Sequence, residues 1–126
     1  VNAINTKIES IESLVEIIKR SDINLVIDCF DNMEARKIAV KAAKKAKVHC
    51  VHIGFNPIGA WAVIWQDKYE IYDEDEDANT DMCTLQGAYS FITKVASYAS
   101  LIISDYFNDS SMVSYIGNKY SSMKLN

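Results

Sequence analysis

Two carboxylates placed close together are the strongest candidates for chemistry in this sequence. Asp28 and Asp31 end an apolar run, and Asn32 and Arg36 follow them. Carboxylates at the carboxyl end of a parallel strand can hold Mg²⁺ while the metal bridges to phosphates. Asp31 and Asn32 also suit a helix N-cap, which needs only one such residue. Arg36 could pair with Glu34 or Asp31, or reach phosphate, so the sequence leaves both kinds of role open.

Cys83 is the second candidate, because it lies between an acidic stretch and a helix-forming stretch. A helix N-terminus favours the reactive thiolate, whereas the six carboxylates of residues 73–81 disfavour it. A reactive and an inert Cys83 therefore both remain open. Cys29 and Cys50 lie in apolar runs, where a free cysteine packs as a small hydrophobic residue.

Metal binding by cysteine or histidine is not expected. The sequence contains no Cys-x-x-Cys pair, which argues against a zinc site. His49 and His52 are three positions apart, so on a regular strand they point to opposite faces and cannot share a metal. Each is expected to be hydrogen-bonded or at the surface.

The elements that must position Asp28 and Asp31 form a β-α-β unit. Residues 24–30 and 48–55 are short, nearly continuous apolar runs, as is typical of parallel strands buried on both faces. Between them, residues 33–47 are rich in alanine, and their lysines gather in the last turn, where the helix dipole favours them.

The flanking sequence predicts two further helices and an antiparallel hairpin. Apolar residues at helical spacing predict an amphipathic helix over 7–20 and a long helix over 84–107. Two runs joined at Asp67 predict a hairpin of strands 60–66 and 68–72. We assign residues 1–107 to one α/β domain, and the pattern does not assign a structure to the tail, 108–126.

Composition excludes several classes of protein. The chain has 126 residues, of which 24% are charged and 49% hydrophobic, and its net charge is −4. Six of the 17 acidic residues lie in 73–81, leaving 11 against 13 basic residues elsewhere, so the dominant basic surface of a nucleic-acid binder is not expected. No run of about 18 apolar residues predicts a membrane span, and no signal peptide is recognised, so a cytoplasmic protein is expected.

Residues 26–36, Val-Ile-Asp-Cys-Phe-Asp-Asn-Met-Glu-Ala-Arg, resemble the strand-and-helix motif of the ThiF/MoeB family. That family also contains the adenylation domains of ubiquitin-activating enzymes, and its motif is roughly D-x-x-D-N-x-x-x-R. Residues 1–5 resemble the segment before that strand. Residues 83–88, Cys-Thr-Leu-Gln-Gly-Ala, resemble the start of the family's long C-terminal helix, so the resemblance spans about residues 1–107.

The resemblance implies ATP- and Mg²⁺-dependent adenylation of the C-terminus of a ubiquitin-like or sulfur-carrier protein of β-grasp fold. It implies that Asp31 is catalytic and holds Mg²⁺, and that Asp28, Asn32 and Arg36 lie with it beside the cofactor. Cys83 matches a cysteine that forms a thioester or persulfide in some members.

The family's glycine-rich loop, ribose-binding acid and phosphate-binding Arg and Lys all precede the aspartate motif, and the 126 residues contain no G-x-G-x-x-G. The chain therefore resembles the C-terminal half of a Rossmann-like ThiF-type domain, which alone should neither bind ATP tightly nor adenylate a substrate. The alternative is a non-catalytic binding or assembly module that keeps the fold. If the missing half supplies neighbouring strands, strand 24–30 lacks a partner along one edge, which favours a homo-oligomer with this strand or the hairpin at the contact.

Overall fold

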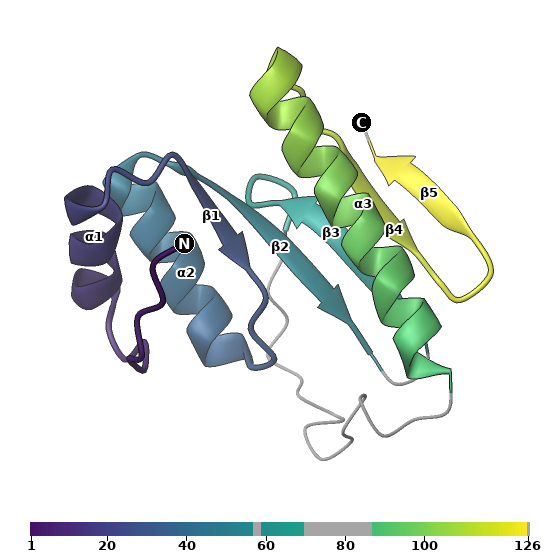
Figure 1. Cartoon of the computed structure of the whole chain (residues 1–126), viewed down its shortest axis with the longest axis horizontal. Helices are drawn as coiled ribbons and strands as arrows, with labels where there is room; N and C mark the ends of the chain where they lie inside the picture. Colours follow the sequence, from purple (N-terminus) through teal and green to yellow (C-terminus); the bar gives the residue numbers. More distant parts are fainter. Residues whose placement is uncertain (57–58, 70–86, 126) are drawn as a thin grey trace.

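The computed structural model describes residues 1–56, 59–69 and 87–125 as an α/β fold with one mixed sheet (Figure 1). Cys83 and the acidic stretch 73–81 lie outside the described residues. In chain order the elements are α1 (Ile11–Arg20), β1 (Leu25–Asp28), α2 (Met33–Ala46), β2 (His49–Phe55), β3 (Trp61–Trp65), α3 (Ala88–Asp109), β4 (Ser114–Gly117) and β5 (Ser122–Leu125).

The predicted β-α-β unit is confirmed. Strands β1 and β2 are parallel, with Leu25 opposite His49 and Asp28 opposite His52, and α2 connects them. The remaining pairs, β2–β3, β3–β4 and β4–β5, are antiparallel, which gives the sheet order β1-β2-β3-β4-β5.

The antiparallel part uses different strands from those expected. Strand β3 is present, but Lys68 and Tyr69 lie outside any strand, and residues 70–72 lie outside the described ones. β3 instead pairs with β2 on one side and with β4 on the other. The tail that the sequence left unassigned supplies β4 and β5, so it completes the sheet after the long helix.

Helices α2 and α3 cover opposite faces of the sheet. One core cluster joins Val63 and Trp65, both fully buried, to Val95 and Ile102 of α3. The other joins α1 to α2, with Val26 of β1 packed against it. Successive strand residues point to opposite faces, so the two clusters form two cores separated by the sheet. No helix in the described ranges is long and apolar enough to cross a membrane.

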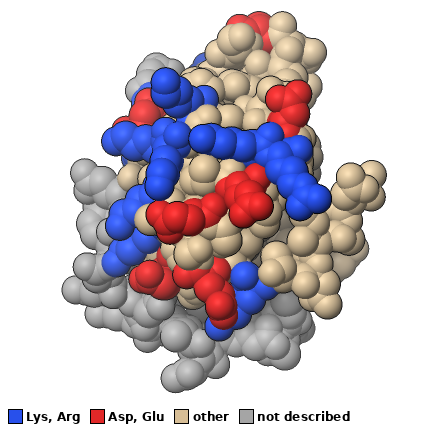
Figure 2. Space-filling model, turned by 90° about the vertical axis from the view of Figure 1, so that its left-hand side faces the viewer, with Lys and Arg blue, Asp and Glu red and all other residues tan. Residues whose placement is uncertain are grey.

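Helix α1 packs against α2 rather than against the sheet (Figure 1). Its N-cap is Ser10, whose hydroxyl accepts a hydrogen bond from the Ser13 amide at 3.1 Å. Both helices end in basic residues, which suit the negative end of the helix dipole. Figure 2 shows basic side chains in a band across the upper part of this side and acidic ones below, so neither sign dominates it.

Among the described strands, β1 and β5 form the edges of the sheet. β1 exposes 45% of Ile27 there, and Phe55 at the end of β2 is 38% exposed. The side chain of residue 27 points to the α3 face of the sheet. Helix α3 packs on β2 and β3, so it does not cover this part of β1. An apolar edge strand of this kind is a ready site for pairing with another chain.

Gly117 in β4 lies where a side chain has no room, which gives a stability prediction. A Cβ there would lie 2.8 Å from the Trp61 ring and would also collide with the Ser121 carbonyl oxygen. Gly117→Ala should therefore lower the free energy of unfolding by about 1–3 kcal/mol, measured by urea denaturation. The exposed helix substitution Ser100→Ala is the control and should leave the urea midpoint nearly unchanged. Equal midpoints for both variants would contradict the predicted clash.

Candidate functional site

The site begins where β1 ends. Asp28 is 1% exposed, and its Oδ1 accepts a hydrogen bond from the Phe30 amide at 2.9 Å, which closes the turn toward α2. Its Oδ2 contacts His52 Nδ1 and lies 3.6 Å from Arg36 Nη1. Asp28, the first aspartate of the motif, is thus buried and connects β1, β2 and α2 through its contacts.

Arg36 is also buried, at 7% exposure. The sequence left Arg36 open between phosphate contact and pairing with Glu34 or Asp31. The structure pairs it with a carboxylate, but that carboxylate belongs to Asp28. Its Nη2 also donates to the carbonyl oxygen of Ile53 at 3.0 Å. A Cβ at Gly54 would lie 3.0 Å from that nitrogen, so the guanidinium lies directly against the backbone of β2.

The sequence left open which of Asp31 and Asn32 caps α2 and which is available for a ligand, and the structure distinguishes them. Asn32 is the N-cap of α2, and its side-chain oxygen accepts from the Ala35 amide at 2.8 Å. Asp31 does not cap the helix. Its carboxylate is exposed, and among the described residues its hydrogen-bond partner is the Asn32 amide nitrogen, at the long distance of 3.4 Å. Of the two motif carboxylates, that of Asp31 is therefore the exposed one, whereas that of Asp28 is buried.

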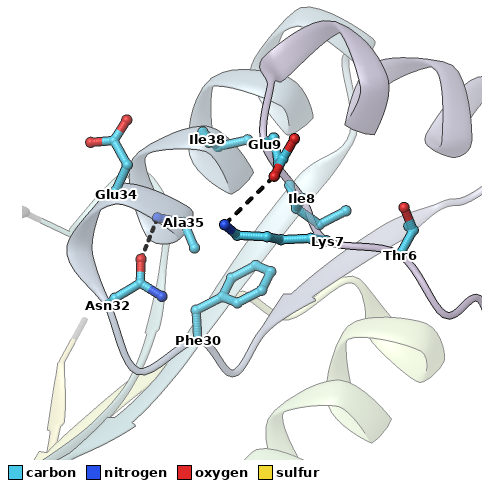
Figure 3. Close-up of a pocket in the computed structure, with 9 residues that line it drawn as sticks. All are labelled: Thr6, Lys7, Ile8, Glu9, Phe30, Asn32, Glu34, Ala35 and Ile38. Atoms are coloured by element: carbon cyan, nitrogen blue, oxygen red, sulfur yellow. Dashed lines mark hydrogen bonds and ion pairs between the residues drawn. The ribbon is translucent and has the colours of Figure 1, made fainter.

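A cavity of about 630 Å³ opens beside this turn (Figure 3). Phe30, Asn32 and Glu34 line one side of it. The segment before α1 lines the other, where Lys7 lies across from Phe30 and pairs with Glu9 at 3.5 Å. The cavity thus combines an aromatic ring, the paired Lys7 and Glu9, the Glu34 carboxylate and the N-terminus of α2. Of these features, the helix N-terminus is the one that favours an anionic ligand.

Sequence reasoning missed both Lys7 and the role of His52. His52 was expected to be hydrogen-bonded or at the surface, and the structure buries it at 1% exposure against Asp28, so the first alternative holds. The signal was available, because aligning the two strands of the β-α-β unit places residue 52 opposite residue 28. Nothing in the sequence pattern marked Lys7, since its position depends on how the N-terminal segment folds back toward α2.

The described cysteines are free, and their environments differ. Burial raises the pKa of the Cys50 thiol to about 12, so it stays protonated at neutral pH. Cys29 was expected to pack as a core residue, but it is exposed after β1. Partial desolvation of its thiol still raises the pKa of Cys29. Within the described ranges, no group of three His, Cys, Asp or Glu residues could hold a metal ion.

The comparisons agree with the motif and the fold. The sequence profile of the ThiF family matches residues 1–116, and the chain therefore belongs to the ThiF family. This is a family of adenylyltransferases that act on ubiquitin-like or sulfur-carrier proteins. No curated protein and no solved structure matches the chain.

The division of roles between Asn32 and Asp31 can be tested by stability. Asn32→Ala removes the cap of α2 and should lower the free energy of unfolding by about 1 kcal/mol. Asp31→Ala removes an exposed side chain and should change it by less than about 0.5 kcal/mol. Urea denaturation of both variants makes the comparison. A larger loss for Asp31→Ala would mean that Asp31, not Asn32, is the structural residue.

Proposed function

We propose that this chain is part of an ATP-dependent adenylyltransferase that activates the C-terminus of a ubiquitin-like, β-grasp protein. The observation that carries the proposal is the exposed carboxylate of Asp31. It lies at the carboxyl end of a parallel strand and directly before a helix N-terminus, in a chain that belongs to the ThiF family. Ligands of open α/β sheets bind at that edge.

The residues around Asp31 suit Mg-ATP. Mg²⁺ takes one or two protein carboxylates and completes its shell with water and phosphate oxygens, so a single exposed aspartate is sufficient. The start of α2 adds positive potential beside the cavity, whereas Lys7 is paired with Glu9 and Glu34 adds a carboxylate to the lining. ATP would supply the α-phosphate that the partner's carboxylate attacks, with pyrophosphate as the leaving group. Asp31 would hold the metal, and Asn32 would keep the helix N-terminus ordered beside it.

Asp28 and Arg36 support the site in a different way from Asp31. Both were expected beside the cofactor, but each is buried and paired with the other. We assign them an indirect part, in which they hold the turn that carries Asp31. The charge that neutralises phosphate would then come from the Arg and Lys that precede the aspartate motif in the family.

The phosphate-binding loop would come from outside these 126 residues, since the sequence contains no glycine-rich fingerprint. In this proposal the chain supplies the C-terminal part of the domain and does not bind ATP tightly alone. The free thiols of Cys29 and Cys50 suit the reducing cytoplasm in which we place the protein. If the sequence encoded before Val1 lacks such a loop, the non-catalytic assembly module becomes the better description.

The Asp31 assignment predicts a loss of catalysis without a loss of fold. In the adenylating protein that contains this chain, Asp31→Ala should slow ATP–pyrophosphate exchange roughly 100-fold, because one group that neutralises transition-state charge is removed. Glu16→Ala, which removes an exposed carboxylate from α1 outside the cavity lining, is the control and should retain most of the exchange. Unchanged exchange in Asp31→Ala, with an unchanged melting temperature, would remove Asp31 from the catalytic site.

Cys83 is proposed to act after activation, in a later acyl- or sulfur-transfer step. Cys83→Ser should therefore leave ATP–pyrophosphate exchange intact and affect only the later, thiol-dependent acyl or sulfur transfer. The reason is that ATP already supplies the leaving group of the first step, so no thiol is needed there. Loss of the exchange reaction in a folded Cys83→Ser protein would overturn this order of events.

We also propose that the chain forms a homo-oligomer through the edge strand β1. Two copies of β1 can pair about a two-fold axis, using the same surface on both chains and covering Ile27. Ile27→Lys should give the monomer mass by light scattering, because a charge on an edge strand opposes pairing. Leu101→Lys, a similarly exposed position on α3, should not change the mass. A wild-type chain that is monomeric at high concentration would refute the proposal.

A further inference from the structure

A row of buried polar side chains crosses β1 and β2 on the face that α2 covers. It consists of Asp28, His52 and Cys50, which are 1%, 1% and 0% exposed. His52 Nδ1 contacts Asp28 Oδ2, and His52 Nε2 lies 3.9 Å from Cys50 Sγ. The Tyr69 ring stacks on the imidazole, with centroids 4.1 Å apart and an interplanar angle of 22°. This imidazole is therefore held on its edges by hydrogen-bonding groups and on one face by an aromatic ring.

The partners of His52 determine where its proton lies. An ionised aspartate can only accept, so Nδ1 carries the hydrogen and donates it to Asp28. The raised pKa of Cys50, about 12, keeps that residue a thiol, which can donate to an unprotonated Nε2. With this tautomer of a neutral His52, the order of donation runs from Cys50 to His52 to Asp28, and both ring nitrogens have a partner.

The order Cys-His-Asp is also that of nucleophilic sites, but this one cannot act as such. The Cys50 sulfur is fully buried, and burial holds it in the unreactive thiol form. The hydrogen bonds that start at Cys50 and pass through His52 end at the Asp28 carboxylate. The Oδ1 of that residue, the oxygen that His52 does not contact, receives the Phe30 amide and so sets the turn immediately before Asp31.

We propose that His52 is a positioning residue that orients the Asp28 carboxylate and thereby the turn that presents Asp31. Arg36 contacts the same Oδ2 from α2, at 3.6 Å, but also donates to the Ile53 carbonyl, so it links the turn to the end of β2. His52 provides the closer contact to Oδ2 and fixes its direction within the sheet. The consequence for catalysis rests on the proposed function, whereas the effect on the turn does not.

The turn itself can be followed by amide hydrogen exchange in the 126-residue chain. His52→Asn keeps a donor at the position of Nδ1, and His52→Leu removes it at similar volume. His52→Leu should speed exchange of the Phe30 amide roughly tenfold or more beyond any change in global stability, since a hydrogen bond to a charged group is lost. His52→Asn should restore the slow exchange. The Ser13 amide, held by the Ser10 hydroxyl in α1, is the internal control and should not respond.

Equal acceleration in both variants, or acceleration that only follows the global stability, would reduce His52 to a packing residue. If His52→Leu does not fold, nitrogen-15 spectra of the wild-type imidazole decide the question. A proton on Nδ1 is expected, and a proton on Nε2 alone would overturn the proposal.

ATP–pyrophosphate exchange in the adenylating protein should fall in His52→Leu and recover in His52→Asn. A wild type without exchange activity, but with the predicted amide behaviour, would refute the proposed function and leave the positioning role standing.

Discussion

The burial of one carboxylate, that of Asp28, is the constraint on which the site depends. An isolated charge removed from water costs several kcal/mol, so its oxygens must be met by donors. Here the donors come from three places: the Phe30 amide in the next turn, His52 on the neighbouring strand and Arg36 on the following helix. All three reach Asp28 only if β1 and β2 pair in the observed register and α2 begins where it does.

This arrangement separates structural from chemical tasks within a few residues. The Asn32 side chain accepts a hydrogen bond from an amide in the first turn of α2, and the Asp28 side chain accepts one from the Phe30 amide in the preceding turn. Asp31, between them, has no structural task that would bury it. An exposed carboxylate on a turn that is held from both sides loses little conformational freedom when it binds a metal or ligand, which is the advantage of a preorganised site.

The sequence was sufficient to predict helices and strands whose signals are local. It was not sufficient to predict strands that form only by pairing with a distant part of the chain. Apolar runs and capping residues predicted the β-α-β unit within a few residues of its observed bounds, because those signals act over one helix or strand. The strands β4 and β5 could not be predicted, since the short, polar segment after α3 acquires its structure by pairing with β3. Asp31 and Asn32 were recognised as a pair, but only the structure shows which of them caps the helix and that Arg36 is paired with Asp28.

The order of the strands in the chain has a consequence for how the protein is made. β3 lies in the middle of the sheet, yet its partner on one side, β4, follows about 50 residues later, after the whole of α3. The Trp65 amide receives its hydrogen-bond acceptor, the Ser114 hydroxyl, only from that late segment. During synthesis, the central strand therefore stays unpaired on one side until residues 114–117 have emerged from the ribosome. A chain that ends before β4 would expose this strand permanently and should be prone to aggregation.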